Sequence, residues 1–143
     1  MPRTVAQAQM LEEQDIHIDL IFNFMCREDI LLEKLMGRRV CPNCNRNYNV
    51  TSIDRDGYFM KPLLPKGDPK ICDDCPGVHL VVRDDDKENI IRKRQEIYKN
   101  KTEPILDFYR ENTNTIMIDF EAKRGIDDFP KMKEILDDAL AKI

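Results

Sequence analysis

Residues 41–44 have the sequence Cys-Pro-Asn-Cys, and residues 72–75 repeat the pattern as Cys-Asp-Asp-Cys. A Cys-x-x-Cys turn presents two thiolates to one metal ion, and two such turns complete a tetrahedral site of four sulfurs. This pattern is typical of structural zinc, so we predict a Zn²⁺ site within a small β-rich lobe. The predicted ligands are Cys41, Cys44, Cys72 and Cys75.

Disulfide bonds are the alternative use of the same four cysteines. No secretory signal is visible at the first residues, and the fifth cysteine, Cys26, lies in an apolar run. We interpret Cys26 as a buried small apolar residue. These features favour an intracellular, reducing compartment, cytoplasmic or mitochondrial, where paired cysteine turns bind metal more often than they form disulfides.

The composition of the chain restricts its function. The 143 residues suit one ordinary domain, and a hydrophobic fraction of 41% is enough for a core. The net charge of −4 argues against a dominant nucleic-acid-binding surface, which is normally basic. No apolar run approaches the length of a transmembrane helix. We therefore expect no nucleic-acid partner and no membrane association.

The hydrophobic pattern predicts regular structure on both sides of the cysteine-rich lobe. Helices are predicted at 6–14, 27–36, 86–112 (with a break at Thr102-Glu103-Pro104) and 129–143, and buried strands at 16–25 and 115–119. This order predicts an α/β fold that contains part of a parallel sheet and an inserted lobe. Because parallel sheets need cover on both faces and more than two strands, we expect the chain to be part of something larger or to need a partner.

Arginines flank the lobe on both sides. Gly37-Arg38-Arg39 leads into the first cysteine turn, and Arg83-Asp84-Asp85-Asp86 follows the second. The planar guanidinium group binds phosphate oxygens through two parallel hydrogen bonds. A metal-stabilised lobe between arginines therefore predicts a lid that handles phosphate.

Several ordered motifs together resemble the adenylate kinase family of nucleoside monophosphate kinases. Residues 36–40 (Met-Gly-Arg-Arg-Val), the four-cysteine lobe, residues 83–86 and residues 92–94 (Arg-Lys-Arg) resemble its zinc-binding type of lid region. Residues 102–109 resemble the segment after the lid, and residues 2–7 (Pro-Arg-Thr-Val-Ala-Gln) resemble the monophosphate-binding segment. The resemblance extends over essentially the whole chain.

The resemblance implies reversible phosphoryl transfer from ATP or GTP to AMP, with Mg²⁺ accompanying the nucleotide. It implies part of a parallel sheet of the P-loop kinase type with an inserted zinc lid. Residues 1–37 would be the C-terminal part of the core, beginning in the monophosphate segment. Residues 38–83 would be the lid, and residues 84–143 would be core again, with the C-terminal helices and strand. Closure of the lid would exclude water from the reacting groups.

The resemblance also implies catalytic roles for individual residues. Arg38 would contact the triphosphate, and Arg83 and Arg94 would clamp the transferring group, which makes these three arginines the expected catalytic residues. Asn47 and Tyr48 would lie near the triphosphate nucleotide, together with Arg38.

The resemblance further implies an AMP site. Arg3 would bind the phosphate of AMP and Gln7 its adenine, while Arg83 and Arg94 would complete the site as the lid closes. Carboxylates of the lid would pair with its arginines and bias closure. These carboxylates would be Asp85 and Asp86.

The chain departs from the family in one major respect, because it contains no G-x-x-x-x-G-K-[ST] phosphate-binding loop. We therefore expect a fragment, the C-terminal part of such an enzyme, whose partner is the missing N-terminal part and which is inactive or nearly so by itself. Lys34 stands where the family often has arginine. Residues 119–125 depart from the family's adenine loop, which leaves the donor base open between adenine and guanine.

Two other classes of function stay open. A zinc ribbon that binds nucleic acid or protein uses the same cysteine framework, and a salt-dependent nucleic-acid affinity would support it against the acidic balance. A non-catalytic interaction protein would dock through an exposed sheet edge. Capture of a full-length kinase or of an N-terminal half would favour that second class.

Overall fold

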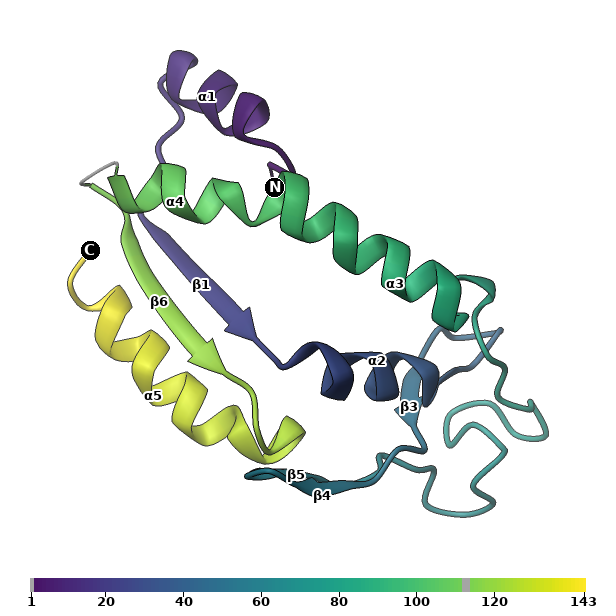
Figure 1. Cartoon of the computed structure of the whole chain (residues 1–143). Helices are drawn as coiled ribbons and strands as arrows, with labels where there is room; N and C mark the ends of the chain where they lie inside the picture. Colours follow the sequence, from purple (N-terminus) through teal and green to yellow (C-terminus); the bar gives the residue numbers. More distant parts are fainter. Residues whose placement is uncertain (1, 112–113) are drawn as a thin grey trace. The chain divides into compact units, whose positions relative to one another are not determined.

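The computed structural model describes residues 2–111 and 114–143 and has a mixed α/β architecture (Figure 1). The helices are α1 (Val5–Glu13), α2 (Glu28–Met36), α3 (Glu88–Ile97), α4 (Pro104–Glu111) and α5 (Phe129–Leu140). The strands are β1 (Leu20–Met25), β2 (Arg38–Val40), β3 (Asn47–Asn49), β4 (Ile53–Arg55), β5 (Tyr58–Met60) and β6 (Ile116–Glu121). Short helical turns form at η1 (Asp84–Asp86), η2 (Tyr98–Thr102) and η3 (Gly125–Asp128). No helix within the described ranges combines the length and apolar character that a membrane crossing requires.

The chain divides into two compact units. The first contains Met1–Met25, Lys93–Ala122 and Asp128–Ile143, and the second contains Cys26–Arg92 and Lys123–Asp127. Each unit has its own buried cluster of apolar side chains. The functional division at residues 37/38 and 83/84 stays a prediction.

A parallel pair of strands, β1 and β6, forms the sheet of the first unit. The pairing runs in register from Leu20 opposite Ile116 to Met25 opposite Glu121. The sheet lies between α4 and α5 in Figure 1. The predicted α/β fold with a parallel sheet and an inserted β-rich lobe is therefore confirmed, although the first strand begins at Leu20 and is shorter than the predicted segment 16–25.

The core of the first unit gathers where α1 and α4 pack on this sheet. Ala8 and Tyr109 are fully buried and Ile105 nearly so, and Ile21 and Met117 pack against them from the two strands. Because side chains alternate across a strand, Ile21 and Met117 share the sheet face that α4 covers. Burial of these apolar groups, more than helix propensity, holds the short α1 in place.

The predicted helix over 86–112 is interrupted near its predicted break. The π-helical turn η2 joins α3 to α4, and the N–H of Glu103 donates to the carbonyl of Tyr98 at 2.8 Å. Pro104 is the first residue of α4, a position where the missing N–H costs nothing. The segment is therefore two helices with a wide turn between them, and the predicted end at residue 112 lies outside the described residues.

Two antiparallel hairpins build the second unit. Strand β2 pairs with β3, and β4 pairs with β5 through a two-residue turn at Asp56-Gly57. The backbone φ angles of these two residues are 54° and 82°. Positive φ at both positions is the mark of a type I′ turn, for which Asp-Gly is a favoured pair.

An apolar cluster attaches the β4–β5 hairpin to α2. Ile30 of α2 is fully buried against Ile53, Tyr58 and Met60 of the hairpin, and Cys26 packs at the edge. Cys26 is half-buried. A hairpin of two three-residue strands is not stable alone, so this contact with α2 is what holds it.

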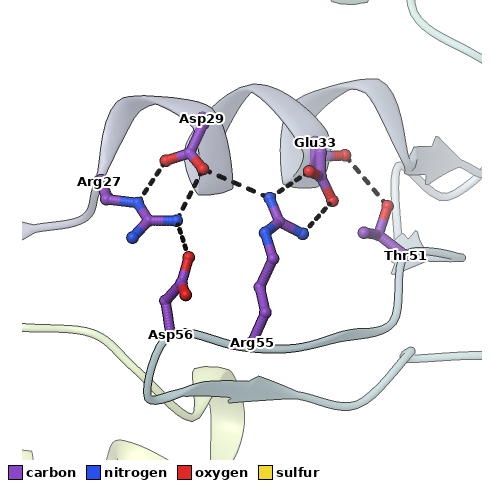
Figure 2. Close-up of polar contacts among 6 residues, drawn as sticks. All are labelled: Arg27, Asp29, Glu33, Thr51, Arg55 and Asp56. Atoms are coloured by element: carbon purple, nitrogen blue, oxygen red, sulfur yellow. Dashed lines mark hydrogen bonds and ion pairs between the residues drawn. The ribbon is translucent and has the colours of Figure 1, made fainter.

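Charged side chains reinforce the same contact, as Figure 2 shows. Arg27 donates to both carboxylate oxygens of Asp29, at 2.6 and 2.8 Å, and to Asp56 in the hairpin turn at 2.7 Å. The hydrogen bonds with Asp29 and then with Asp56 raise the pKa of Arg27. The same contact with Arg27 holds the pKa of Asp29 well below its usual range. One guanidinium group thus links the start of α2 to the hairpin.

Arg55 makes the second link between hairpin and helix. Its guanidinium group contacts both carboxylate oxygens of Glu33, one of them at 3.0 Å, and reaches Asp29 at 3.4 Å (Figure 2). Glu33 and Asp29 are four residues apart and therefore lie on the same face of α2. The hairpin is held along the length of that face.

The end of α2 is satisfied by side chains from the lobe. The hydroxyl of Thr51 donates to the carbonyl of Glu33 at 3.0 Å, and the amide of Asn49 donates to the carbonyl of Lys34 at 2.8 Å. Carbonyls at the end of a helix need partners from outside it, and the carbonyl of Glu33 also accepts the N–H of Gly37 at 2.9 Å. Gly37 follows directly, and a β-carbon placed on it would lie 1.7 Å from Thr51 Oγ1. The cap therefore requires glycine at this position.

We predict that Gly37→Ala lowers the free energy of unfolding by about 1–3 kcal/mol, because the added methyl group forces Thr51 away from the helix end. Gly67→Ala is the matched control, since a β-carbon there meets nothing within 4 Å. That variant should change stability by less than about 0.5 kcal/mol. Urea unfolding of both variants tests the prediction, and equal midpoints would contradict it.

Candidate functional site

The sulfur atoms of the four paired cysteines converge in the second unit. All of them lie within 4.8 Å of one another, and the sulfurs of Cys44 and Cys72 are 3.6 Å apart. Zinc–sulfur bonds of about 2.3 Å in a tetrahedron place sulfurs about 3.8 Å apart. Cys41, Cys72 and Cys75 are buried, and Cys44 is exposed. The donor set and its spacing therefore fit a closed, tetrahedral metal site.

Tight backbone turns present these thiols. In the first turn, the N–H of Asn45 donates to the carbonyl of Cys41 at 2.9 Å, and Asn45 has a φ of 61°. In the second, the N–H of Val78 donates to the carbonyl of Cys75 at 3.1 Å, and Gly77 has a φ of 74°. A left-handed residue after each pair reverses the chain, so that both sulfurs of a pair point to the same side.

The thiols differ in acidity. Desolvation opposes ionisation of Cys72, but hydrogen bonds from Tyr48, from the backbone of Asp74 and from neighbouring thiols lower its pKa to about 7. The backbone N–H of Arg46 favours the Cys44 thiolate, but desolvation and the neighbouring thiols outweigh it and raise the pKa of Cys44 to about 12. A bound cation would favour the thiolate form of every ligand, because metal binding releases their protons.

Arg38, at the start of β2, is paired with a buried carboxylate. Its Nε and Nη2 donate to the two oxygens of Asp86 at 2.8 and 2.6 Å. Asp86 is 3% exposed, whereas the Arg38 side chain keeps 23% of its surface in solvent. The hydrogen bonds with Asp86 are the main cause that raises the pKa of Arg38. The guanidinium group is thus fixed in place with part of its surface accessible.

Arg83 is paired in the same two-pronged way with Asp85. Its Nε and Nη2 donate to the carboxylate at 2.9 and 2.8 Å, and both side chains are exposed. The prediction that Asp85 and Asp86 pair with arginines of the lid agrees with these contacts. The short turn η1 accounts for them, because it projects the two aspartates toward Arg83 and Arg38.

The remaining predicted phosphate and AMP residues lie in the first unit. Arg94 is exposed on α3. Arg3 precedes α1, and its backbone N–H donates to the side-chain carbonyl of Gln7 at 2.7 Å. The N–H of Gln7 donates in turn to the hydroxyl of Thr4, the N-cap residue, at 3.3 Å. Gln7 therefore has a capping role in this structure, and its contact with adenine stays a prediction.

The predicted nucleotide residues of the lobe, Asn47 and Tyr48, lie side by side on β3. Asn47 is exposed, but Tyr48 is only 3% exposed. The phenol oxygen of Tyr48 lies 3.6 Å from the sulfur of Cys72 and accepts the N–H of Asp73 at 3.0 Å. The side chain of Tyr48 thus belongs to the cysteine cluster, and its predicted place near a nucleotide is untested.

Sequence reasoning missed one more contact of the cluster. The amide of Asn43, inside the first cysteine turn, donates to the sulfur of Cys75 in the second turn at 3.2 Å. The only signal in the sequence was the position of Asn43 between two ligands, and the Cys-x-x-Cys pattern accepts any residue there.

Curated proteins with related sequences are named adenylate kinase or GTP:AMP phosphotransferase. The chain is 39% identical over 136 residues to a GTP:AMP phosphotransferase of Plasmodium falciparum (isolate 3D7). The aligned region covers 94% of this chain and 57% of the relative. It is 38% identical over 142 residues to a probable chloroplastic adenylate kinase 6 of Oryza sativa subsp. japonica, with 94% and 46% covered. It is 39% identical over 122 residues to an adenylate kinase of Petrotoga mobilis, with 82% and 51% covered.

These alignments include most of the chain but only part of each relative. The chain spans about half the length of the curated relatives it matches. No protein-family model matches the sequence.

We predict that Arg38→Ala lowers the free energy of unfolding by about 3 kcal/mol, the lower end of the range for breaking a buried ion pair, because Asp86 is left buried without its partner. Arg83→Ala removes an equivalent but exposed pair and should cost less than about 1 kcal/mol. Urea unfolding of the two variants measures the difference. A loss for Arg38→Ala no larger than that for Arg83→Ala would refute the structural importance of the Arg38–Asp86 pair.

Proposed function

We propose that this chain, as a member of the adenylate kinase family, supplies the lid and part of the AMP site for phosphoryl transfer. The substrates would be AMP and a nucleoside triphosphate, ATP or GTP, since relatives carry names of both kinds. The observation that best supports the proposal is the pair of two-pronged arginine–aspartate contacts at Arg38 and Arg83. Guanidinium groups oriented in this way suit phosphate oxygens.

Asp85 and Asp86 give the lid a defined state without nucleotide, in which they pair with Arg83 and Arg38. In the proposed reaction, phosphate oxygens of the triphosphate contact the accessible part of Arg38, which keeps its hydrogen bonds with the buried Asp86, and those of the transferring group compete with the exposed Asp85 for Arg83. Without nucleotide, the carboxylates neutralise the two guanidinium charges. With nucleotide, Arg83 exchanges one anionic partner for another and loses little hydrogen bonding, which eases closure of the lid.

The other residues keep their predicted roles in this proposal. Arg94 joins Arg83 on the transferring phosphoryl group, where fixed positive charge stabilises the transition state. Arg3 binds the phosphate of AMP, and Gln7 contacts its adenine. Asn47 contacts the triphosphate nucleotide from the exposed side of β3. Any contact from Tyr48, the neighbour of Asn47, would come through its backbone.

We propose Zn²⁺ as the ion of the four-cysteine site. Four thiolates in a closed tetrahedron select zinc over magnesium or calcium, which prefer oxygen ligands. The ion supplies folding energy to the lobe and takes no part in phosphoryl transfer. Mg²⁺ would enter separately with the nucleotide. The need for reduced thiols favours a reducing, intracellular compartment.

The phosphate cradle of the triphosphate must come from another segment, since the sequence of this chain has no glycine-rich phosphate loop. We propose that an N-terminal part of the same protein provides this loop and its lysine. The isolated chain is then expected to bind nucleotides weakly and to transfer phosphoryl groups slowly or not at all.

In a protein that joins this sequence to the family's phosphate-binding loop, we predict that Arg94→Ala lowers kcat by about 100-fold or more, because a fixed charge on the transferring group is lost. Arg92→Ala is the matched control, since Arg92 is an exposed arginine of the same helix that pairs with Glu88. Formation of ADP or of GDP and ADP from the two nucleotides measures the rate. Wild-type turnover in the Arg94 variant would exclude this arginine from the site.

We predict that Cys44→Ser reduces the zinc content of the purified chain well below one ion per molecule and lowers its melting temperature, because metal binding is coupled to folding. Cys26→Ala is the control, since Cys26 lies outside the sulfur cluster and should leave the zinc content unchanged. Elemental analysis and thermal unfolding provide the readouts. Unchanged zinc content and melting in Cys44→Ser would exclude the four-cysteine site.

A further inference from the structure

Tyr48 lies in the apolar cluster that surrounds the candidate metal ligands. It packs with Cys41, Cys72 and Cys75, and only 3% of its surface is exposed. A buried phenol normally requires a hydrogen-bond partner. The partners of the Tyr48 hydroxyl therefore indicate what this side chain does.

The hydrogen bonds of Tyr48 leave its hydroxyl proton free to be donated to the sulfur of Cys72. Its oxygen accepts the N–H of Asp73 at 3.0 Å and lies 3.6 Å from the sulfur of Cys72. An N–H is only a donor, so the phenol is the acceptor in that contact. A metal-bound thiolate is only an acceptor, so toward the sulfur of Cys72 the phenol must be the donor.

The ring of Tyr48 is held in this orientation by a neighbouring arginine. The guanidinium carbon of Arg46 lies 5.3 Å from the centre of the ring, within the range of a cation–π contact. Arg46 is itself fixed by Asp74, inside the second cysteine turn, at 2.7 Å. The phenol therefore has little freedom to turn away from the sulfur.

A second side chain makes the same kind of contact with the other thiol of that turn. The amide of Asn43 donates to the sulfur of Cys75 at 3.2 Å. Asn43 lies inside the first cysteine turn and Tyr48 follows it, whereas Cys72 and Cys75 form the second turn. Both donors therefore reach from one half of the site to ligands supplied by the other half.

We propose that Tyr48 and Asn43 are positioning residues of the metal centre, which donate hydrogen bonds to the ligand sulfurs of Cys72 and Cys75. The inference rests on the proposed four-cysteine metal site. Four thiolates around a divalent cation leave net negative charge on the sulfurs, and hydrogen bonds to the sulfurs disperse it. Because each bond crosses between the two turns, it also fixes how the ligand pairs face each other before the ion binds.

The test is the affinity of the whole chain for Zn²⁺ and its spectrum with Co²⁺. Tyr48→Phe removes only the hydroxyl and keeps the ring under Arg46. We expect about 10- to 100-fold weaker Zn²⁺ binding in competition with a chelator, the usual effect of losing a partner of a metal ligand. The sulfur-to-cobalt charge-transfer band should move to longer wavelength, because a thiolate without its hydrogen bond gives up electron density more easily.

Two further variants complete the test. Asn43→Ala changes an exposed residue, so it should preserve folding while weakening Zn²⁺ binding and shifting the cobalt band in the same direction. Tyr58→Phe removes a hydroxyl from another buried tyrosine of the same unit, in the hairpin cluster away from the sulfurs, and should leave both readouts unchanged.

The possible outcomes distinguish a failure of the positioning role from a failure of the proposed metal site. If the wild-type chain binds neither Zn²⁺ nor Co²⁺ through its thiols, the metal site itself fails. If it binds both, and the Tyr48 and Asn43 variants match its affinity within about twofold with unmoved cobalt bands, the positioning role is overturned. Weaker binding with a shifted band in these two variants, and not in Tyr58→Phe, supports it.

Discussion

The convergence of four cysteine sulfurs is the constraint on which the lobe depends. Strands β2 to β5 contain three residues each, too few to form a stable sheet without support. Thiols crowded within 4.8 Å resist joint ionisation, because like charges at that distance repel. The proposed divalent cation would remove the repulsion and tie together two turns that are far apart in sequence. On the proposed metal site, metal affinity would replace a large hydrophobic core in this lobe.

Outside the four cysteines, the second unit is likewise held together without a large hydrophobic core. Its β4–β5 hairpin is held on α2 by one small apolar cluster and by the charged contacts of Arg27 and Arg55. The same unit contains the Arg38–Asp86 and Arg83–Asp85 pairs, the groups proposed to meet phosphate. A stiff lobe fixes the backbone beside these arginines, and guanidinium groups that are already oriented lose less entropy when they bind an anion.

Part of this arrangement could be predicted from the sequence. The spacing of the cysteines predicted the sulfur cluster, and the order of apolar segments predicted the parallel pair β1 and β6, because both signals are local and periodic. The contacts of Tyr48 and Asn43 with sulfur were not predicted, since they depend on how two distant turns face each other. Tyr48 was instead predicted near a nucleotide, from resemblance alone. The ion pairs of Arg27 and Arg55 were not predicted either, since they depend on how the β4–β5 hairpin lies on α2.

X-ray absorption at the zinc edge of the purified chain tests the central claim most directly. The account predicts about one zinc ion per chain, with four sulfur neighbours at about 2.3 Å and no nitrogen or oxygen ligand in the inner shell. A chain without zinc whose cysteines are paired as disulfides would contradict it, and so would a zinc ion bound chiefly by nitrogen and oxygen.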